Sequence, residues 1–305
     1  MLAGLLAQHS VPEQLILDRK MLKQFLFKNM IKQVKIEIKN SINQIEFKFT
    51  FAAILLVSLI SIILNCYQDF GHNILSIRSY VDNSMYVSIK ARAIITIFQY
   101  LSPLIVMIIY SSSKWKEEKN GMQTMIITRI KKRDYYVSKF IANFMLVFSV
   151  ILFSGILNLI ISYIVYPTVG FDNRWGIPVY DIIQGYNQNI LFDFLRIQNP
   201  LIYILSKILL ISIFLAAVSN IPYSLSFIKP LSQMEFIEIC IMSFIGIAGI
   251  SIIGIIFNLS FLNYISYMVI DANISFLSVC VSVIVLNLSE ILILIKGIKK
   301  YETIH

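Results

Sequence analysis

The sequence predicts an all-α, polytopic membrane protein with six transmembrane helices, and three observations lead to this fold class. Of 305 residues, 57% are hydrophobic and only 14% are charged, whereas soluble domains carry about 25% charged residues. The hydrophobic residues are concentrated in six runs, each near the roughly 20 residues that a helix needs to cross a bilayer. The basic residues gather in the segments that flank alternate runs, a pattern typical of the cytoplasmic side of membrane proteins.

The predicted spans are 49–66, 94–110, 140–165, 201–224, 237–257 and 274–295. We expect one transmembrane domain over 49–295, preceded by an N-terminal segment (1–48) and followed by a short tail (296–305). The longer connections are a link at 111–139 and, on the opposite side, three loops at 67–93, 166–200 and 258–273.

The basic residues also predict the orientation. The N-terminal segment, the link, the tail and Lys229 together carry 20 of the 26 Lys and Arg residues. With six spans these segments share one side of the membrane, and the positively charged side is the cytoplasmic one. We therefore expect a multi-pass protein of a bacterial plasma membrane with both termini in the cytoplasm. The net charge of +9 does not lie on a folded basic domain, so nucleic acid is not an expected partner.

An amphipathic helix is predicted in the N-terminal segment. Six apolar residues recur every three or four positions on one helical stripe: Phe27, Ile31, Val34, Ile38, Ile42 and Ile45. Four lysines follow one position later, about 100° around the helix: Lys28, Lys32, Lys35 and Lys39. Lysines beside an apolar stripe are typical of a helix lying in the headgroup layer of a membrane. The alternative is a soluble helix packed on a partner protein.

The link carries the most informative pattern. Glu117 and Glu118 favour a helix start, because carboxylates stabilise the positive end of a helix. The short helix that follows has an apolar stripe that needs a groove on another surface, since two turns are unstable alone in water. The predicted docking residues are Glu117, Glu118, Gly121, Met122, Met125, Ile126, Arg129 and Ile130. A basic turn at the membrane surface completes the link: Lys131, Lys132, Arg133 and Lys139.

This link resembles that of the ABC-2 type transporter permease family. In that family a Glu, a Gly, a short hydrophobic helix, a basic turn, an aromatic residue and a Lys succeed one another before the third span. The matching positions here are Glu118, Gly121, 125–127, Arg133, Tyr136 and Lys139. The family usually has a proline before the basic turn, where this sequence reads Thr128-Arg129-Ile130, so the exit from the link differs. Elsewhere the resemblance is one of topology.

The resemblance implies the membrane-spanning subunit of an ATP-driven exporter. The link would be the coupling helix, seated in a cleft of a separate ATPase, and its movement would alternate access to a cavity between two permeases. The implied partners are two ATPase subunits, a second copy or paralogue of this chain, and membrane lipids. ATP and Mg would be held by the ATPase, with no cofactor on this chain. The implied substrate is an amphipathic or hydrophobic peptide, lipid or drug.

Three residues within the spans are candidates for a translocation path: Pro103, Lys207 and Glu290. Pro103 removes a backbone donor and should kink span two. Charges inside apolar spans are costly and are therefore often functional. We expect Lys207 to reach the outer headgroups and Glu290 to lie a turn or more from the inner end of its span. Small residues in span five favour close packing, within the subunit or against another one: Ser243, Gly246, Gly249 and Gly254.

Enzymatic activity is not expected of this chain. The sequence contains neither a GxxxxGK[ST] phosphate loop nor an HExxH zinc motif. Its histidines, His9, His72 and His305, are too scattered for a metal site. Two other classes stay open. An ion-coupled secondary transporter is expected to have broken helices and intramembrane carboxylates, and a membrane scaffold or sensor would have the same hydropathy without transport.

Overall fold

The computed structural model describes residues 30–110, 112–128, 130–168, 191–227, 233–268 and 274–304. Within these ranges the chain is helical, without strands, and six helices are long and apolar enough to cross a membrane. The long helices are α2 (Ile45–Asp69), α3 (Arg92–Ile108), α6 (Lys132–Val165), α8 (Pro200–Leu225), α9 (Gln233–Ile256) and α10 (Phe276–Ile304). The short ones are η1 (Ile74–Ser76), α4 (Ser113–Lys119), α5 (Met122–Ile127), α7 (Asp193–Gln198), η2 (Ser260–Leu262) and η3 (Tyr264–Tyr267). A helical segment at 30–42 precedes α2. The predicted all-α class and the six apolar helices are confirmed.

Several helices extend beyond the predicted spans. α6 begins at Lys132 instead of 140, and α10 continues to Ile304 instead of ending at 295, so the predicted tail is largely part of a helix. Hydropathy limits the part of a helix that can lie in hydrocarbon, but a charged sequence can continue the same helix into water. The 34 residues of α6 span about 50 Å, well over a hydrocarbon core of about 30 Å.

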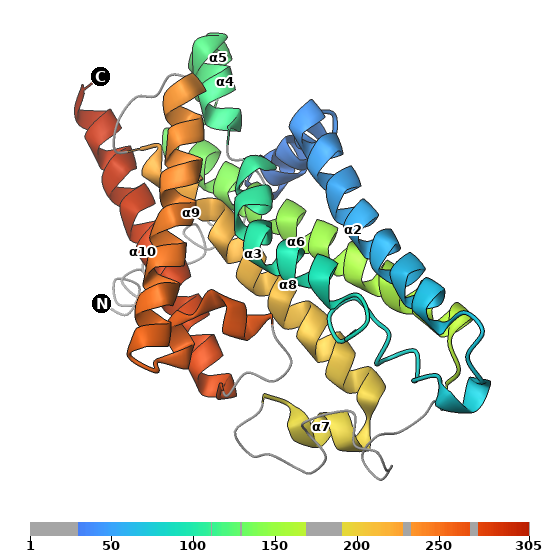
Figure 1. Ribbon diagram of the computed structural model, residues 1–305. Helices are drawn as coiled ribbons and strands as arrows, with labels where there is room; N and C mark the ends of the chain where they lie inside the picture. The colour runs from blue at the N-terminus through green and yellow to red at the C-terminus, as the bar shows by residue number, and fades with distance from the viewer. Residues whose placement is uncertain are drawn as a thin grey trace, which may run out of the picture.

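α8 is the central helix of the bundle (Figure 1). It packs against α3, α6, α9 and α10, and 67% of the residues in its most apolar stretch are buried. In the most apolar stretches of α9 and α10, only 22% and 17% of the residues are buried. The outward faces of these two helices carry many large apolar side chains. A surface of this kind is stable against lipid or an apolar partner and is unfavourable in water.

One end of the bundle collects several segments that are distant in the sequence. The start of α2, the short helices α4 and α5, and the last turns of α8 and α10 all lie there (Figure 1). We call it the link end. The described parts of the N-terminal segment, the link and the tail, which the basic residues predict to share one side, are therefore at the same end of the bundle.

At the opposite end, residues 67–93 fold onto the helices. The Asn65 amide of α2 donates to the Asn83 carbonyl at 2.8 Å, and the Met85 N–H donates to Asn158 Oδ1 of α6 at 2.8 Å. Both contacts are buried. Backbone groups of this loop are therefore paired with side chains of α2 and α6.

The glycines of α9 and α10 differ in their surroundings. A Cβ added at Gly297 of α10 would lie 2.3 Å from the Cβ of Phe227, whereas one at Gly246 or Gly249 of α9 would meet nothing within 4 Å. Gly254 is in close contact with Leu262. Within the described residues, the interpretation of Gly246 and Gly249 as packing residues inside the subunit is therefore wrong. Both face open space.

The contact between α8 and α10 gives a first prediction. Gly297→Ala should lower the free energy of unfolding by about 1–3 kcal/mol, because the new methyl group collides with Phe227. The matched control is Gly249→Ala, which adds the same methyl group to open space and should leave stability unchanged or raise it by up to about 1 kcal/mol. Thermal unfolding in detergent followed by circular dichroism measures both. Equal effects of the two substitutions would contradict the assigned packing.

Candidate functional site

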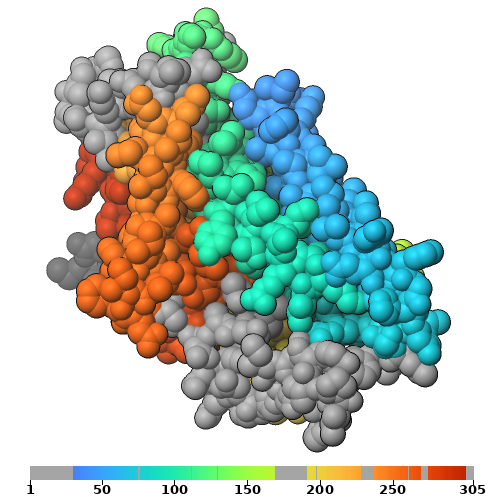
Figure 2. All heavy atoms as spheres, viewed as in Figure 1, coloured from blue at the N-terminus to red at the C-terminus, as the bar shows by residue number. Residues whose placement is uncertain are grey.

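The link folds as two short helices that protrude from the link end of the bundle (Figures 1 and 2). Gly121 separates them with a φ of 68°, a conformation that is unfavourable for residues with a Cβ. Glu117 and Glu118 consequently lie in the last turn of α4, and α5 begins at Met122. The predicted helix start at the two glutamates is therefore wrong, because the left-handed turn at Gly121 divides the pattern.

Lys139 of α6 lies at the centre of a buried ion cluster. Its Nζ is 3.0 Å from Glu37 Oε2 in the 30–42 helical segment and 2.7 Å from Glu117 Oε1 in α4. The tyrosine hydroxyls of Tyr110 and Tyr135 donate to Glu37 and Glu117, respectively. Each carboxylate thus has both an ammonium and a hydroxyl partner. The cluster connects the N-terminal helical segment, α4 and α6.

The burial of this cluster corrects two assignments. The Lys139 side chain is 0% exposed, so it does not belong to the basic turn at the membrane surface. Glu117 turns toward Lys139 and away from the surface predicted to dock a partner. The physical reason is that α6 begins at Lys132, which places Lys139 two turns inside a helix that is already packed. Charged groups in such a place require charged partners.

Two other lysines attach α4 to the bundle. The Lys114 ammonium donates to the Ser226 carbonyl at 2.9 Å and lies 3.7 Å from the ring centroid of Phe227, both just past the end of α8. A cation over an aromatic ring is attracted most strongly when it is desolvated, and Lys114 is buried. Lys116 pairs with Glu46 in the first turn of α2. With the ion cluster, α4 is joined to four helical elements.

α5 has an anchored face and an exposed face. Ile126 and Ile127 pack on an aromatic cluster at the link end of α6, α8 and α10, and Gln123 Nε2 donates to the Tyr136 hydroxyl at 2.6 Å. The buried members of the cluster are Tyr135, Tyr136, Phe140, Tyr223, Phe227, Leu294 and Ile298. On the other face, Met122 and Met125 are 52% and 72% exposed. The protruding helix therefore presents an apolar surface from a firmly held base.

The other predicted link residues are mostly at the surface. Glu118 is exposed and Ile130 is half-buried, while Arg129 lies outside the described residues. The rest of the basic turn is exposed or half-buried: Lys131, Lys132 and Arg133. Of the predicted docking residues, those that remain available to a partner gather around Met122 and Met125.

The N-terminal helical segment faces the bundle with polar side chains. Gln33, Glu37 and Ser41 are buried at a spacing of four, and Gln33 Nε2 donates to Glu37 Oε1 at 3.0 Å. Val34 and Ile38 pack beside them. The remaining described members of the apolar stripe are exposed: Ile31, Ile42 and Ile45. Phe27 lies outside the described residues. The regular spacing of the three polar residues is the sequence signal that locates Glu37, which the apolar stripe does not reveal.

The three candidates for a translocation path are not brought together. Pro103 is buried in α3, which continues through it. Lys207 is 3% exposed within α8, so the expectation that it reaches the outer headgroups is wrong. Glu290 is 2% exposed and lies five residues, or more than one turn, before the end of the apolar run at Ile295, as the sequence predicts. The helix continues to Ile304 through a charged sequence.

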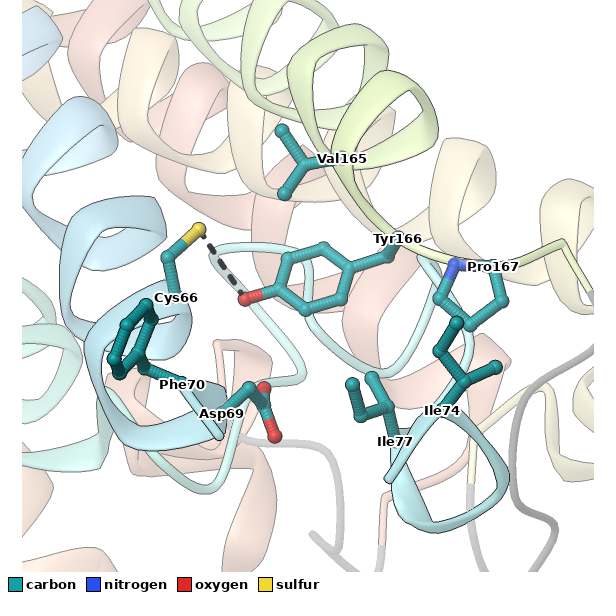
Figure 3. A pocket seen from close by; sticks show the side chains of 8 residues that line it. All are labelled: Cys66, Asp69, Phe70, Ile74, Ile77, Val165, Tyr166 and Pro167. Atoms are coloured by element: carbon teal, nitrogen blue, oxygen red, sulfur yellow. Dashed lines mark hydrogen bonds between the residues drawn. The ribbon is translucent and has the colours of Figure 1, made fainter. Parts of the chain in front are cut away.

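A pocket of about 430 Å³ lies at the end opposite the link (Figure 3). The Tyr166 ring extends from the end of α6, and its hydroxyl donates to Cys66 Sγ of α2 at 3.6 Å. Burial raises the pKa of the Tyr166 hydroxyl, so it remains a donor. Asp69, which also lines the pocket, pairs with Lys90. In the described part of the chain, no three His, Cys, Asp or Glu side chains are placed to hold a metal ion.

The fold and the anchored link define the class of the protein: an all-helical chain with six helices that can span a membrane and a short helical link that protrudes from one end. Comparisons with protein-family models, curated proteins and solved structures found no match.

The buried ion cluster gives a second prediction. Lys139→Met should lower the free energy of unfolding by about 3–5 kcal/mol, because it leaves Glu37 and Glu117 without their shared cation. Thermal unfolding in detergent measures the loss. Adding Glu37→Gln and Glu117→Gln to Lys139→Met removes the uncompensated charges and should restore most of the stability.

The control for this experiment is Lys131→Met, which removes an exposed lysine one residue before α6. It should change stability by less than about 0.5 kcal/mol. A Lys139→Met protein as stable as the Lys131→Met protein would show that the cluster does not hold the link end together.

Proposed function

We propose that this chain is the membrane-spanning subunit of an exporter driven by a separate ATPase, with α5 as the helix that docks on that ATPase. The observation that carries the proposal is the apolar exposed face of Met122 and Met125 on a helix whose other face is anchored to the bundle. A solvated loop has no need for exposed methionines, whereas flexible, polarizable methionines are common at surfaces that bind helical or grooved partners.

The anchoring of α4 and α5 supports a mechanical role. A displacement of α5 acts on α6 and α8 through the aromatic cluster, and a displacement of α4 acts on α2 and α6 through the ion pairs. α8 in turn packs against most of the other long helices. A partner that moves the link therefore moves transmembrane helices, which is the requirement for converting ATP-driven closure into alternating access.

The assembly that follows from this proposal has two ATPase subunits and two permeases, either two copies of this chain or this chain with a paralogue. ATP and Mg bind to the ATPase, since the sequence has no phosphate loop. The link end faces the cytoplasm of a bacterial cell, with both termini on that side, in accord with its basic residues. An amphipathic or hydrophobic peptide, lipid or drug suits a path between largely apolar helices.

A second candidate is an ion-coupled secondary transporter, and Glu290 is the observation that favours it. Its side chain is 2% exposed, and it lies within the apolar run of α10, more than one turn before Lys296. Carboxylates in this position are typical of ion-coupled transporters. ATPase activity that copurifies with the chain favours the exporter, and uptake driven by an ion gradient without ATP favours the secondary transporter. A scaffold or sensor leaves the exposed methionines of α5 without a role.

The docking proposal gives a third prediction. Met122→Asp combined with Met125→Asp should lower the ATPase activity that copurifies with the tagged chain at least tenfold, because two carboxylates replace the apolar face. Insertion into the membrane should be unchanged, since neither side chain packs on the bundle. Ile126 is left intact because it contacts the aromatic cluster.

The matched control is Thr124→Asp combined with Thr128→Asp. This variant adds the same two charges at exposed positions that lie about 60° or more away from the methionines around the helix axis. Copurified ATPase activity should remain within about twofold of the unmodified chain. If the methionine variant retains its ATPase, α5 is not the docking helix.

A further inference from the structure

α8 and α10 lie side by side and run in the same direction (Figure 1). Phe227, two residues past the end of α8, lies against Gly297 of α10, because an added Cβ at Gly297 would be 2.3 Å from the Phe227 Cβ. Farther from the link end, Ile213 and Val283 line one groove between the same helices. The two helices therefore lie side by side from this groove to the contact at Gly297, over at least 14 residues, or about 20 Å.

Asn220 is seven residues before Phe227, and Glu290 is seven residues before Gly297, so the two residues lie at about the same level of the neighbouring helices. Both side chains are buried, Asn220 at 0% and Glu290 at 2% exposure. Among the described residues, Asn220 Nδ2 has no hydrogen-bond partner, and both carboxylate oxygens of Glu290 also lack one. One buried donor and two buried acceptors thus lie at about the same level of neighbouring helices without hydrogen-bond partners.

Asn143 of α6 belongs to the same constellation. Its Nδ2 donates to Asn220 Oδ1 at 2.8 Å and to the Ser219 carbonyl at 3.1 Å, while its own Oδ1 has no partner in the described part of the chain. The bond to Asn143 engages Asn220 Oδ1 and leaves Asn220 Nδ2 unpartnered. Three helices therefore contribute polar atoms to one level of the membrane domain.

Among the described residues, the elements that pack on α10 supply no ion pair to Glu290. α10 packs against α8, α6 and η2, and η2 has no titratable side chain. On α8, Tyr223 donates its hydroxyl to the Tyr136 carbonyl at 2.9 Å. On α6, Tyr136 accepts from Gln123, and Lys139 is paired with its two glutamates.

The remaining nearby lysines are distant along the helices. Lys207 of α8 is 13 residues, or about 20 Å, from Asn220 toward the other end. Lys296, one and a half turns past Glu290 on α10, is exposed. A basic side chain from the described elements does not neutralise Glu290 in the way that Lys139 neutralises Glu37 and Glu117.

We propose that Glu290, Asn220 and Asn143 form an intramembrane site that takes up a monovalent cation, either a proton or a sodium ion. An uncompensated carboxylate is strongly unfavourable in an apolar interior, and uptake of one cation removes the net charge. A proton taken from solvent forms an O–H bond on Glu290, which then becomes a hydrogen-bond donor. Asn143 Oδ1, in the same proposed site, is an acceptor that has no donor. A sodium ion uses the oxygens of Glu290 and Asn143 as ligands.

This inference does not rest on the ATPase-docking proposal, and its test uses the chain without an ATPase. The purified full-length chain is reconstituted in phosphatidylcholine vesicles and studied by infrared difference spectroscopy. The pH is varied in sodium-free potassium buffer, and sodium chloride is then added at fixed pH. Glu290→Gln is the main variant, and Glu238→Gln, which changes an exposed carboxyl of α9, is the control.

The expected result is a carboxylic-acid C=O band that is present in the unmodified chain and in Glu238→Gln and absent in Glu290→Gln. Loss of this band on addition of sodium identifies sodium as a ligand that displaces the proton, and a band insensitive to sodium identifies the proton alone. The proposal is overturned if the unmodified chain and Glu290→Gln give the same spectra at every pH and sodium concentration.

A second variant tests the part of Asn220 and serves where Glu290→Gln fails to fold. Asn220→Leu removes the donor that faces the ionised carboxylate, so the pH at which the band is half lost should rise by about one unit, a tenfold change in proton concentration. An unchanged titration in Asn220→Leu would show that Asn220 does not contribute to the site.

Discussion

The link end depends on the buried Lys139 ammonium between the carboxylates of Glu37 and Glu117. A charge buried in a helix bundle is tolerated only with partners, and here the partners come from the N-terminal helical segment and from α4. The requirement to neutralise one lysine therefore fixes two elements that hydrophobic packing alone would hold weakly. The exposed apolar face of α5 has a defined position because α4, next to it, is held in this way.

Anchoring at several points distinguishes this link from an ordinary loop. Lys114 and Lys116 attach α4 to α8 and α2, and Ile126 and Ile127 attach α5 to the aromatic cluster. Each of these contacts is modest in energy, but together they constrain a segment of only two short helices that would be unstable alone. A rigid link is the simplest way to pass a force from one end of the bundle to helices that cross a membrane.

The sequence predicts the six long helices well, because about 20 apolar residues are a strong signal for a span. It predicts poorly which individual lysines are buried and which are exposed. Lys139 and Lys131 both belong to one basic turn by composition, yet Lys139 is buried and Lys131 is exposed. The difference depends on Glu37, which is about 100 positions away. Similarly, hydropathy places Glu290 inside a span, but it shows neither that the charged sequence after Ile295 continues α10 nor that both carboxylate oxygens of Glu290 lack a hydrogen-bond partner among the described residues.

The two proposed sites meet at Phe227. On one side its ring lies under the Lys114 ammonium and against Tyr136 and Tyr223. On the other side its Cβ leaves no room for a side chain at position 297. Asn220 lies only two turns away on α8, about 10 Å along the axis. A shift of α10 against α8 near Glu290 would therefore act on Phe227, which contacts Lys114 of α4. The two proposals are thus connected through one residue, whichever energy source drives the protein.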